Sequence, residues 1–167
     1  SNTRYGWSWS YYILPFLDQS AVYELATDAD DQPTPDKDKY NTKESVVAKV
    51  AIKTYYCPSR RDPKLHSSSY KSDYAGNAGE RGPDGLRDKS SSGLRGVVIQ
   101  TDRDKTRIEL IKDGSSNTIM VGEKALNSLS FGDEGGDNER WNNAGWDEDV
   151  VRYGAGLLSD GTFYGIP

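Results

Sequence analysis

The chain has 167 residues, and its composition already restricts its class. Hydrophobic residues make up 34%, and 4 tryptophans and 11 tyrosines supply enough bulk for one core. The net charge of −5 is too small to favour disorder and has the wrong sign for a phosphate-binding surface, so we expect no nucleic-acid partner. No apolar run approaches the roughly 18 residues that a membrane span requires.

The first predicted element is a helix from Pro15 to Ala26. Proline fits the first turn of a helix, where its missing N–H costs nothing. Apolar residues recur on one face of this helix at spacings of three and four: Leu14, Leu17, Ala21 and Leu25. The acidic stretch 28–39 contains two prolines and is expected to be an exposed loop.

A second helix and a strand are predicted next. Asn41 and Glu44 have the spacing of a capping box, and three valines behind them predict a short helix ending near Ala51. The β-branched and aromatic run 52–56 predicts a strand, which Cys57-Pro58 closes. Residues 60–95 show little periodicity and are expected to form a long irregular excursion.

The second half of the chain predicts short strands separated by turns. Residues 97–99 and 118–121 have strand composition, and between them Thr106 and Glu109 repeat the capping-box spacing ahead of a stop at Gly114. Helices followed by short strands predict an α+β fold with a small antiparallel sheet and long irregular loops.

Catalytic chemistry has little support in the sequence. Cys57 permits no internal disulfide, and Cys57 with His66, the one histidine, leaves too few ligands for a zinc site of Cys and His. Nothing places a base or an orienting carboxylate beside either residue. We interpret His66 as a surface residue and Cys57 as a half-buried thiol at a strand end, and we predict no catalytic residue and no cofactor-binding residue.

An acidic loop is the one candidate metal site. Five side chains with oxygen ligands lie within seven residues: Asp133, Glu134, Asp137, Asn138 and Glu139. Calcium prefers six to eight such oxygens on a flexible loop, and Gly135-Gly136 permits tight curvature. The spacing differs from that of an EF-hand, so a plain exposed acidic loop is the alternative. The candidate calcium ligands are Asp133, Glu134, Asp137 and Asn138.

Carboxylates also lie beside two tryptophans. Trp141 and Trp146 precede Asp147, Glu148 and Asp149, an arrangement that would suit a glycosidase if two carboxylates stood across a sugar. Core aromatic residues flanked by solvated acids explain the same pattern and are the preferred interpretation.

Several short strings occur in an order that resembles the DUF1559 family, which is abundant in planctomycete bacteria. They are GWSW at 6–9 running into ILPFLDQ at 13–19, then YYCPSRR at 55–61, SDYAGN at 72–77 and DGSSNTIMVGEK at 113–124. Each string is short, but their order over residues 6–124 is specific. The family's C-terminal block, His-Pro-Gly-Gly followed by an Asp-Gly-Ser-Val strand, is absent from this chain.

The resemblance implies a pilin-like protein. Members of the family resemble type IV pilins, with a prepilin leader and a hydrophobic N-terminal helix ahead of a soluble domain. The implied fold is a single pilin-like domain over residues 1–167, its N-terminal helix packed on the sheet. The chain begins with Ser1 rather than Met, so we expect that the stem and the C-terminal end have been trimmed. Related pseudopilins hold calcium in a C-terminal acidic loop, which by analogy favours the site at 133–138.

Three functions follow as hypotheses. The first is a non-enzymatic subunit of a type IV pilus or type II secretion-type filament. It is anchored in the inner membrane by the missing helix before assembly, located in the periplasm or at the cell surface, and bound to copies of itself or other pilin-like subunits. The second is an extracellular solute- or glycan-binding module, which requires an accessible Trp141 or Trp146. The third, with the least support, is a hydrolase that uses Asp147 and Glu148.

Overall fold

In the computed structural model, the α-helices belong to one unit of the chain, and the main sheet, apart from its first residue Tyr74, belongs to another. Unit 1 comprises residues 1–74 and 126–150, and unit 2 comprises residues 75–125 and 151–167. The structure describes residues 7–26, 37–80, 96–99, 106–143, 147–154, 156–157 and 163–164. The predicted single domain over residues 1–167 stays a prediction.

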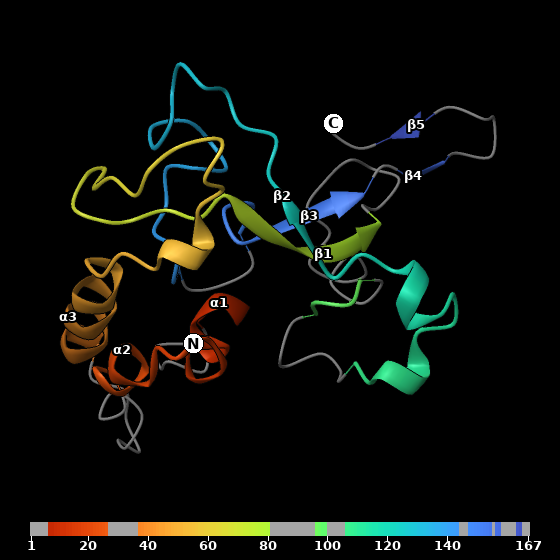
Figure 1. Cartoon of the computed structure of the whole chain (residues 1–167), viewed down its shortest axis with the longest axis horizontal. Coiled ribbons are helices and arrows are strands. Elements are labelled where there is room, and N and C mark those ends of the chain that lie inside the picture. Colours follow the sequence, from red (N-terminus) through yellow and green to blue (C-terminus); the bar gives the residue numbers. More distant parts are fainter. Residues whose placement is uncertain are drawn as a thin grey trace. The chain divides into compact units, whose positions relative to one another are not determined.

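Unit 1 contains short helical segments joined by turns (Figure 1). Its α-helices are α1 (Trp9–Tyr12), α2 (Ser20–Glu24) and α3 (Lys37–Ala48), and its 3₁₀ turns are η2 (Leu14–Leu17) and η4 (Lys53–Tyr55). In the described part of the chain, none of the helices has the length and apolar character that crossing a membrane requires.

The predicted helix 15–26 is wrong as one continuous element. Asp18 has a φ of 57°, in the left-handed region, and its N–H closes the 3₁₀ turn η2 by bonding to the carbonyl of Leu14. A left-handed residue changes the direction of the chain, so the apolar face does not continue in phase beyond it. Leu14 is fully buried, but after Asp18 the buried residues are Val22 and Ala26, and Leu25 is 38% exposed.

Helix α3 confirms the second predicted helix with different bounds. It begins two residues after Pro35, so Asn41 lies inside the helix rather than at its N-cap. The predicted strand 52–56 is wrong, because Lys53–Tyr55 forms the 3₁₀ turn η4. Strand periodicity would expose alternate residues, whereas Ile52, Tyr55 and Tyr56 are all buried.

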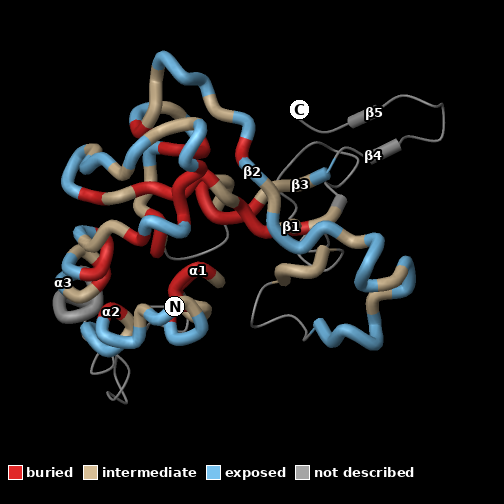
Figure 2. The backbone as a smooth tube through the Cα atoms, in the orientation of Figure 1, coloured by how far each residue is buried: buried red, intermediate tan, exposed pale blue. Residues whose placement is uncertain are grey.

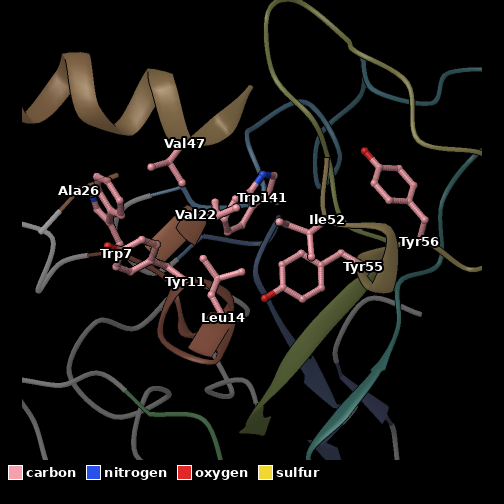
Figure 3. Close-up of a cluster of buried hydrophobic side chains, with 10 residues drawn as sticks. All are labelled: Trp7, Tyr11, Leu14, Val22, Ala26, Val47, Ile52, Tyr55, Tyr56 and Trp141. Carbon is pink, nitrogen blue, oxygen red and sulfur yellow. The ribbon is translucent and has the colours of Figure 1, made fainter. Parts of the chain in front are cut away.

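An aromatic core holds the two sequence segments of unit 1 together. Figure 3 shows its ten buried side chains, which are Trp7, Tyr11, Leu14, Val22, Ala26, Val47, Ile52, Tyr55, Tyr56 and Trp141. The ring centroid of Trp141 lies 5.5 Å from that of Tyr55. The Trp141 carbonyl accepts hydrogen bonds from the hydroxyls of Ser8 and Ser10, at 3.2 and 2.6 Å. The second segment is therefore fixed by both apolar and polar contacts.

Unit 2 contains the sheets. Its three-stranded sheet has the order β2-β1-β3, with β1 at Tyr74–Glu80, β2 at Val121–Glu123 and β3 at Val151–Gly154. The short strands β4 (Gly156–Leu157) and β5 (Phe163–Tyr164) form a separate antiparallel pair. The α+β class is thus confirmed, but β1 and β3 pair in parallel, with Gly76 opposite Val151. The expected sheet was antiparallel throughout, and a parallel pair joins strands far apart in sequence that local patterns do not connect.

The strand positions predicted in unit 2 are partly wrong. The central strand β1 lies within the stretch 60–95, for which the sequence predicts no regular structure. Only Val121 of the predicted strand 118–121 belongs to β2. The described residues 96–99 form no strand, although Val98 donates one backbone hydrogen bond to the Asn77 carbonyl at 3.0 Å. The predicted helix after Thr106 is only the 3₁₀ turn Ile108–Leu110. That turn already ends at Leu110, so the predicted stop at Gly114 is wrong. Gly114, with a φ of 85° that favours glycine, instead begins the next 3₁₀ turn, η7 (Ser115–Asn117).

The corrected helical face yields a test on two leucines. Leu14→Ala should lower the free energy of unfolding by about 2–5 kcal/mol, because it removes a fully buried side chain from the core. Leu25→Ala is the matched control and should cost about 1 kcal/mol or less, because that side chain is already partly in water. Urea denaturation measures both. Equal losses would mean that a continuous helix buries Leu25.

Candidate functional site

The Arg61 guanidinium is a buried charged group of unit 1 that donates a hydrogen bond from each of its three nitrogens. Its Nε donates to Asp73 Oδ1 at 2.8 Å, and its two terminal nitrogens donate to the two oxygens of Asp137 at 2.6 and 2.8 Å. The Arg61 side chain is 7% exposed, and the two carboxylates are essentially buried. One cation thus bonds to carboxylates that lie 12 and 76 residues further along the sequence.

The local backbone and the aromatic rings of Tyr56 and Phe131 position Arg61. The N–H groups of Arg60 and Arg61 both bond to the Cys57 carbonyl, which curls the chain after Pro58. The guanidinium carbon lies 4.7 Å from the ring centroid of Phe131, a cation–π contact. Burial opposes the positive charge, but the hydrogen bonds and charge of Asp137, then the charge of Asp73, raise the pKa of Arg61 above its ordinary value.

Asp73 uses both of its oxygens in this cluster. While Oδ1 accepts from Arg61, Oδ2 accepts the Cys57 N–H at 2.8 Å. The sequence predicts Cys57 to be half-buried at the end of a strand. It is buried, and it follows a 3₁₀ turn instead of a strand. Its Sγ lies 3.2 Å from Ser59 Oγ.

Lys71 is the second buried cation of unit 1. Its Nζ donates to the Asn138 carbonyl at 2.6 Å and to Ser69 Oγ at 3.1 Å. Burial lowers the pKa of Lys71, and the nearby charges of Asp137, Asp149 and Glu139 oppose that effect. A serine beside a lysine of lowered pKa is also the arrangement of a Ser–Lys nucleophile. Here Asn138 supplies a second acceptor, so the geometry is that of a protonated lysine donating to two oxygens.

His66 lies at the border of the cluster and is half-buried. Burial, followed by the positive charges of Arg61 and Lys64, lowers its pKa. A Cβ on Gly132 would lie 2.2 Å from the imidazole, and Gly132 has a φ of +84°, so only glycine fits under this ring. His66 and Ser69 exchange two backbone hydrogen bonds around Ser67 and Ser68, which have positive φ angles of 46° and 77°. The histidine therefore packs against the acidic loop rather than lying in open solvent.

The structure gives the candidate calcium ligands other partners. Both oxygens of Asp137 bond to Arg61, and its Oδ2 also accepts the Gly132 N–H. Glu134 Oε1 accepts the Asn127 N–H at 2.9 Å, and the Asn138 carbonyl accepts from Lys71. Asp133 is exposed. Over the described ranges, no three His, Cys, Asp or Glu side chains gather closely enough to hold a metal. Calcium at this loop stays a prediction, and it requires displacing Arg61 from Asp137.

The aromatic and acidic residues after the loop do not line a sugar site in the described structure. Trp141 is buried, and its Nε1 donates to the Val50 carbonyl at 3.1 Å, so it offers no stacking face to a glycan. Trp146 lies outside the described residues. Asp147 Oδ1 accepts the Asp149 N–H, and Asp149 Oδ1 accepts the Glu139 N–H. These carboxylates close turns of the backbone.

Sequence reasoning missed Arg61, Lys71 and Asp73. All three lie in or beside segments without periodicity, where charged residues are normally solvated. The available signal was their position within or next to two of the strings that carry the family resemblance.

Comparison with known proteins gives one match. The family model described as "Protein of unknown function (DUF1559)" matches residues 1–155. No curated protein and no solved structure matches the chain.

The Arg61 cluster yields a stability test. Arg61→Met should lower the free energy of unfolding by about 3–5 kcal/mol, because it leaves two buried carboxylates without their cation. The matched control is Arg107→Met at an exposed position, expected within about 0.5 kcal/mol of the unaltered chain. Chemical denaturation measures both. If the Met variant does not fold, Arg61→Lys, which keeps one positive charge, replaces it. An Arg61 variant as stable as its control would contradict the role assigned to the cluster.

The buried phenol of Tyr56 predicts alkaline sensitivity. Burial raises its pKa from 10.0 to about 12, and the Lys71 N–H bond and Arg61 charge only partly offset this. Above pH 10.0 the unfolded phenol ionises while the folded one keeps its proton, so stability is lost as the pH rises from 10.0 to about 12. Denaturation curves across this range should show the loss, and Tyr56→Phe should reduce its slope. An unchanged slope would mean that Tyr56 ionises freely in the folded chain.

Proposed function

The chain belongs to the DUF1559 family, and on that premise we propose that it is a structural, non-enzymatic subunit of a pilus- or pseudopilus-type filament. In this proposal the protein is exported, anchored in the inner membrane before assembly, and joined to copies of itself in the periplasm or at the cell surface. Its biochemical task is to present a folded surface to neighbouring subunits.

The contacts made by the strings that carry the family resemblance support this proposal. In YYCPSRR, all three guanidinium nitrogens of Arg61 bond to carboxylates within unit 1. In SDYAGN, both Asp73 oxygens are bonded, and the Asn77 amide donates to the Ile119 carbonyl at 2.7 Å and accepts the Gly79 N–H at 2.8 Å. These polar side chains, which could otherwise do chemistry, are committed to holding loops in place.

The third string is used in the same way. In DGSSNTIMVGEK, the Asn117 amide donates to the Asp113 carbonyl at 3.0 Å, and the Thr118 hydroxyl donates to the Gly114 carbonyl at 3.1 Å. Residues that define a family of enzymes usually converge on a substrate. Residues that instead close turns and bridge loops favour a scaffold, which supports a structural subunit over a hydrolase.

The experiment uses the native gene and the native protein. Translation upstream of Ser1 should reveal a short basic leader followed by about twenty apolar residues, enough for a membrane-spanning stem. Mechanical shearing of cells that produce the full-length protein should then release it in filaments that sediment. A cleavable secretory signal without a retained apolar helix, together with release of monomers, would overturn the proposal.

A further inference from the structure

One short segment of unit 2 leaves several large apolar side chains in water. Its side chains are between 37% and 72% exposed: Ile108, Leu110, Ile119, Met120 and Val121. We call them the 108–121 surface. Figure 2 shows much of this segment, drawn in teal in Figure 1, in the exposed colour. The exposed apolar residues of unit 1 lie on separate segments instead: Phe16, Leu25, Val46, Leu65 and Leu129.

The local hydrogen bonds give this segment its shape. Gly114 N–H closes the turn onto the Ile111 carbonyl at 3.0 Å, and Asn117 and Thr118 bond back to residues 113 and 114. On the strand side, Asn77 donates two hydrogen bonds: its side-chain amide donates to the Ile119 carbonyl and its backbone N–H donates to the Met120 carbonyl. The backbone is thus fixed by polar contacts while its apolar side chains project outward. Exposure here is a property of the folded segment.

The exposed area is of the size that two subunits use. Exposed fractions of this size on five large side chains leave on the order of 500 Å² of apolar surface in total. A standard interface buries about 800 Å² on each partner, of which the centre is the apolar part and the rim is polar. The 108–121 surface is sufficient for such a centre.

The charges around the surface favour a second copy of this chain as the partner. Two copies repel one another overall, because each carries a net charge of −5. The exposed charged residues within and beside the segment are of both signs, with Arg107 and Lys112 against Glu109, Asp113 and Glu123. Each copy carries both signs of charge on this segment, so in a contact between copies the cations of one can face the anions of the other.

The position of β2 supplies a second reason. In the order β2-β1-β3, β2 lies at an edge of the three-stranded sheet, and Val121 is its first residue. Edge strands are the usual place where a second chain adds to a sheet, and an apolar edge strengthens that tendency. An edge beside Ile119 and Met120 combines backbone pairing with apolar contact.

We propose that the 108–121 surface is a contact between copies of this chain, centred on Ile119, Met120 and Val121 at the β2 edge. This inference rests on the proposed function and deepens it, because it names the part of unit 2 through which neighbouring subunits meet.

Disulfide trapping tests the contact. Ile119→Cys places a thiol at the centre of the surface, whereas the native Cys57 is buried. Leu129→Cys, at an exposed position of unit 1, is the matched control. Under mild oxidation of the purified 167-residue chain, the Ile119→Cys variant should form covalent dimers several-fold faster than the control. Adding Met120→Lys should abolish that difference, with thermal melting checking that each variant is folded.

The same variants in the full-length protein separate the two proposals. Filaments that form without a preferential cross-link at position 119 would overturn the contact and leave the proposed function intact. A preferential cross-link at 119 in a protein that never enters filaments would overturn the proposed function and leave the contact intact. Equal cross-linking of both cysteine variants of the purified chain also overturns the contact.

Discussion

The arrangement of unit 1 depends on one buried guanidinium held between two buried carboxylates. Arg61 joins the turn after Cys57 to Asp73, just before β1, and to Asp137 in the acidic loop. Taking three charges out of water has a desolvation cost of several kcal/mol per ion. The attraction between the charges offsets that cost only when every hydrogen bond is made. The net stability gained is therefore modest, whereas any arrangement that separates these groups is strongly penalised. The cluster chiefly determines which loops lie together.

Polar bonds of this kind replace much of the regular secondary structure. A strand normally fixes its neighbour through a ladder of backbone bonds. Here β2 and β3 span three and four residues, and side chains make many of the long-range connections. Trp9 Nε1 donates to the Val150 carbonyl at 2.6 Å, the Tyr55 hydroxyl donates to the Ser10 carbonyl, and Asn77 holds residues 119–120. Tryptophan, tyrosine and asparagine thus contribute specificity as well as bulk, which suits a chain with only 34% hydrophobic residues.

Sequence patterns predicted the elements whose causes are local. The α+β class and the existence of helix α3 follow from the spacing of apolar residues along the chain. The errors arise where a distant contact decides the conformation. Left-handed Asp18 divides the predicted first helix, and burial of Tyr55 and Tyr56 against remote partners makes a 3₁₀ turn of the predicted strand. The acidic loop contains the expected carboxylates. No local pattern could indicate that Asp137 forms a hydrogen-bonded ion pair with Arg61, 76 residues earlier in the chain.

The 108–121 surface of unit 2 keeps large apolar side chains in water, Ile119 and Met120 among them. Burying apolar surface stabilises a protein by about 25 cal/mol of free energy for each Å², and this stabilisation is absent while the side chains stay in water. Repacking those side chains within the segment would require breaking the bonds of Asn77 to the carbonyls of residues 119 and 120. The same polar contacts that order the sheet thus prevent the segment from covering its own apolar side chains. In the proposed filament, the burial of these side chains would come from a neighbouring subunit.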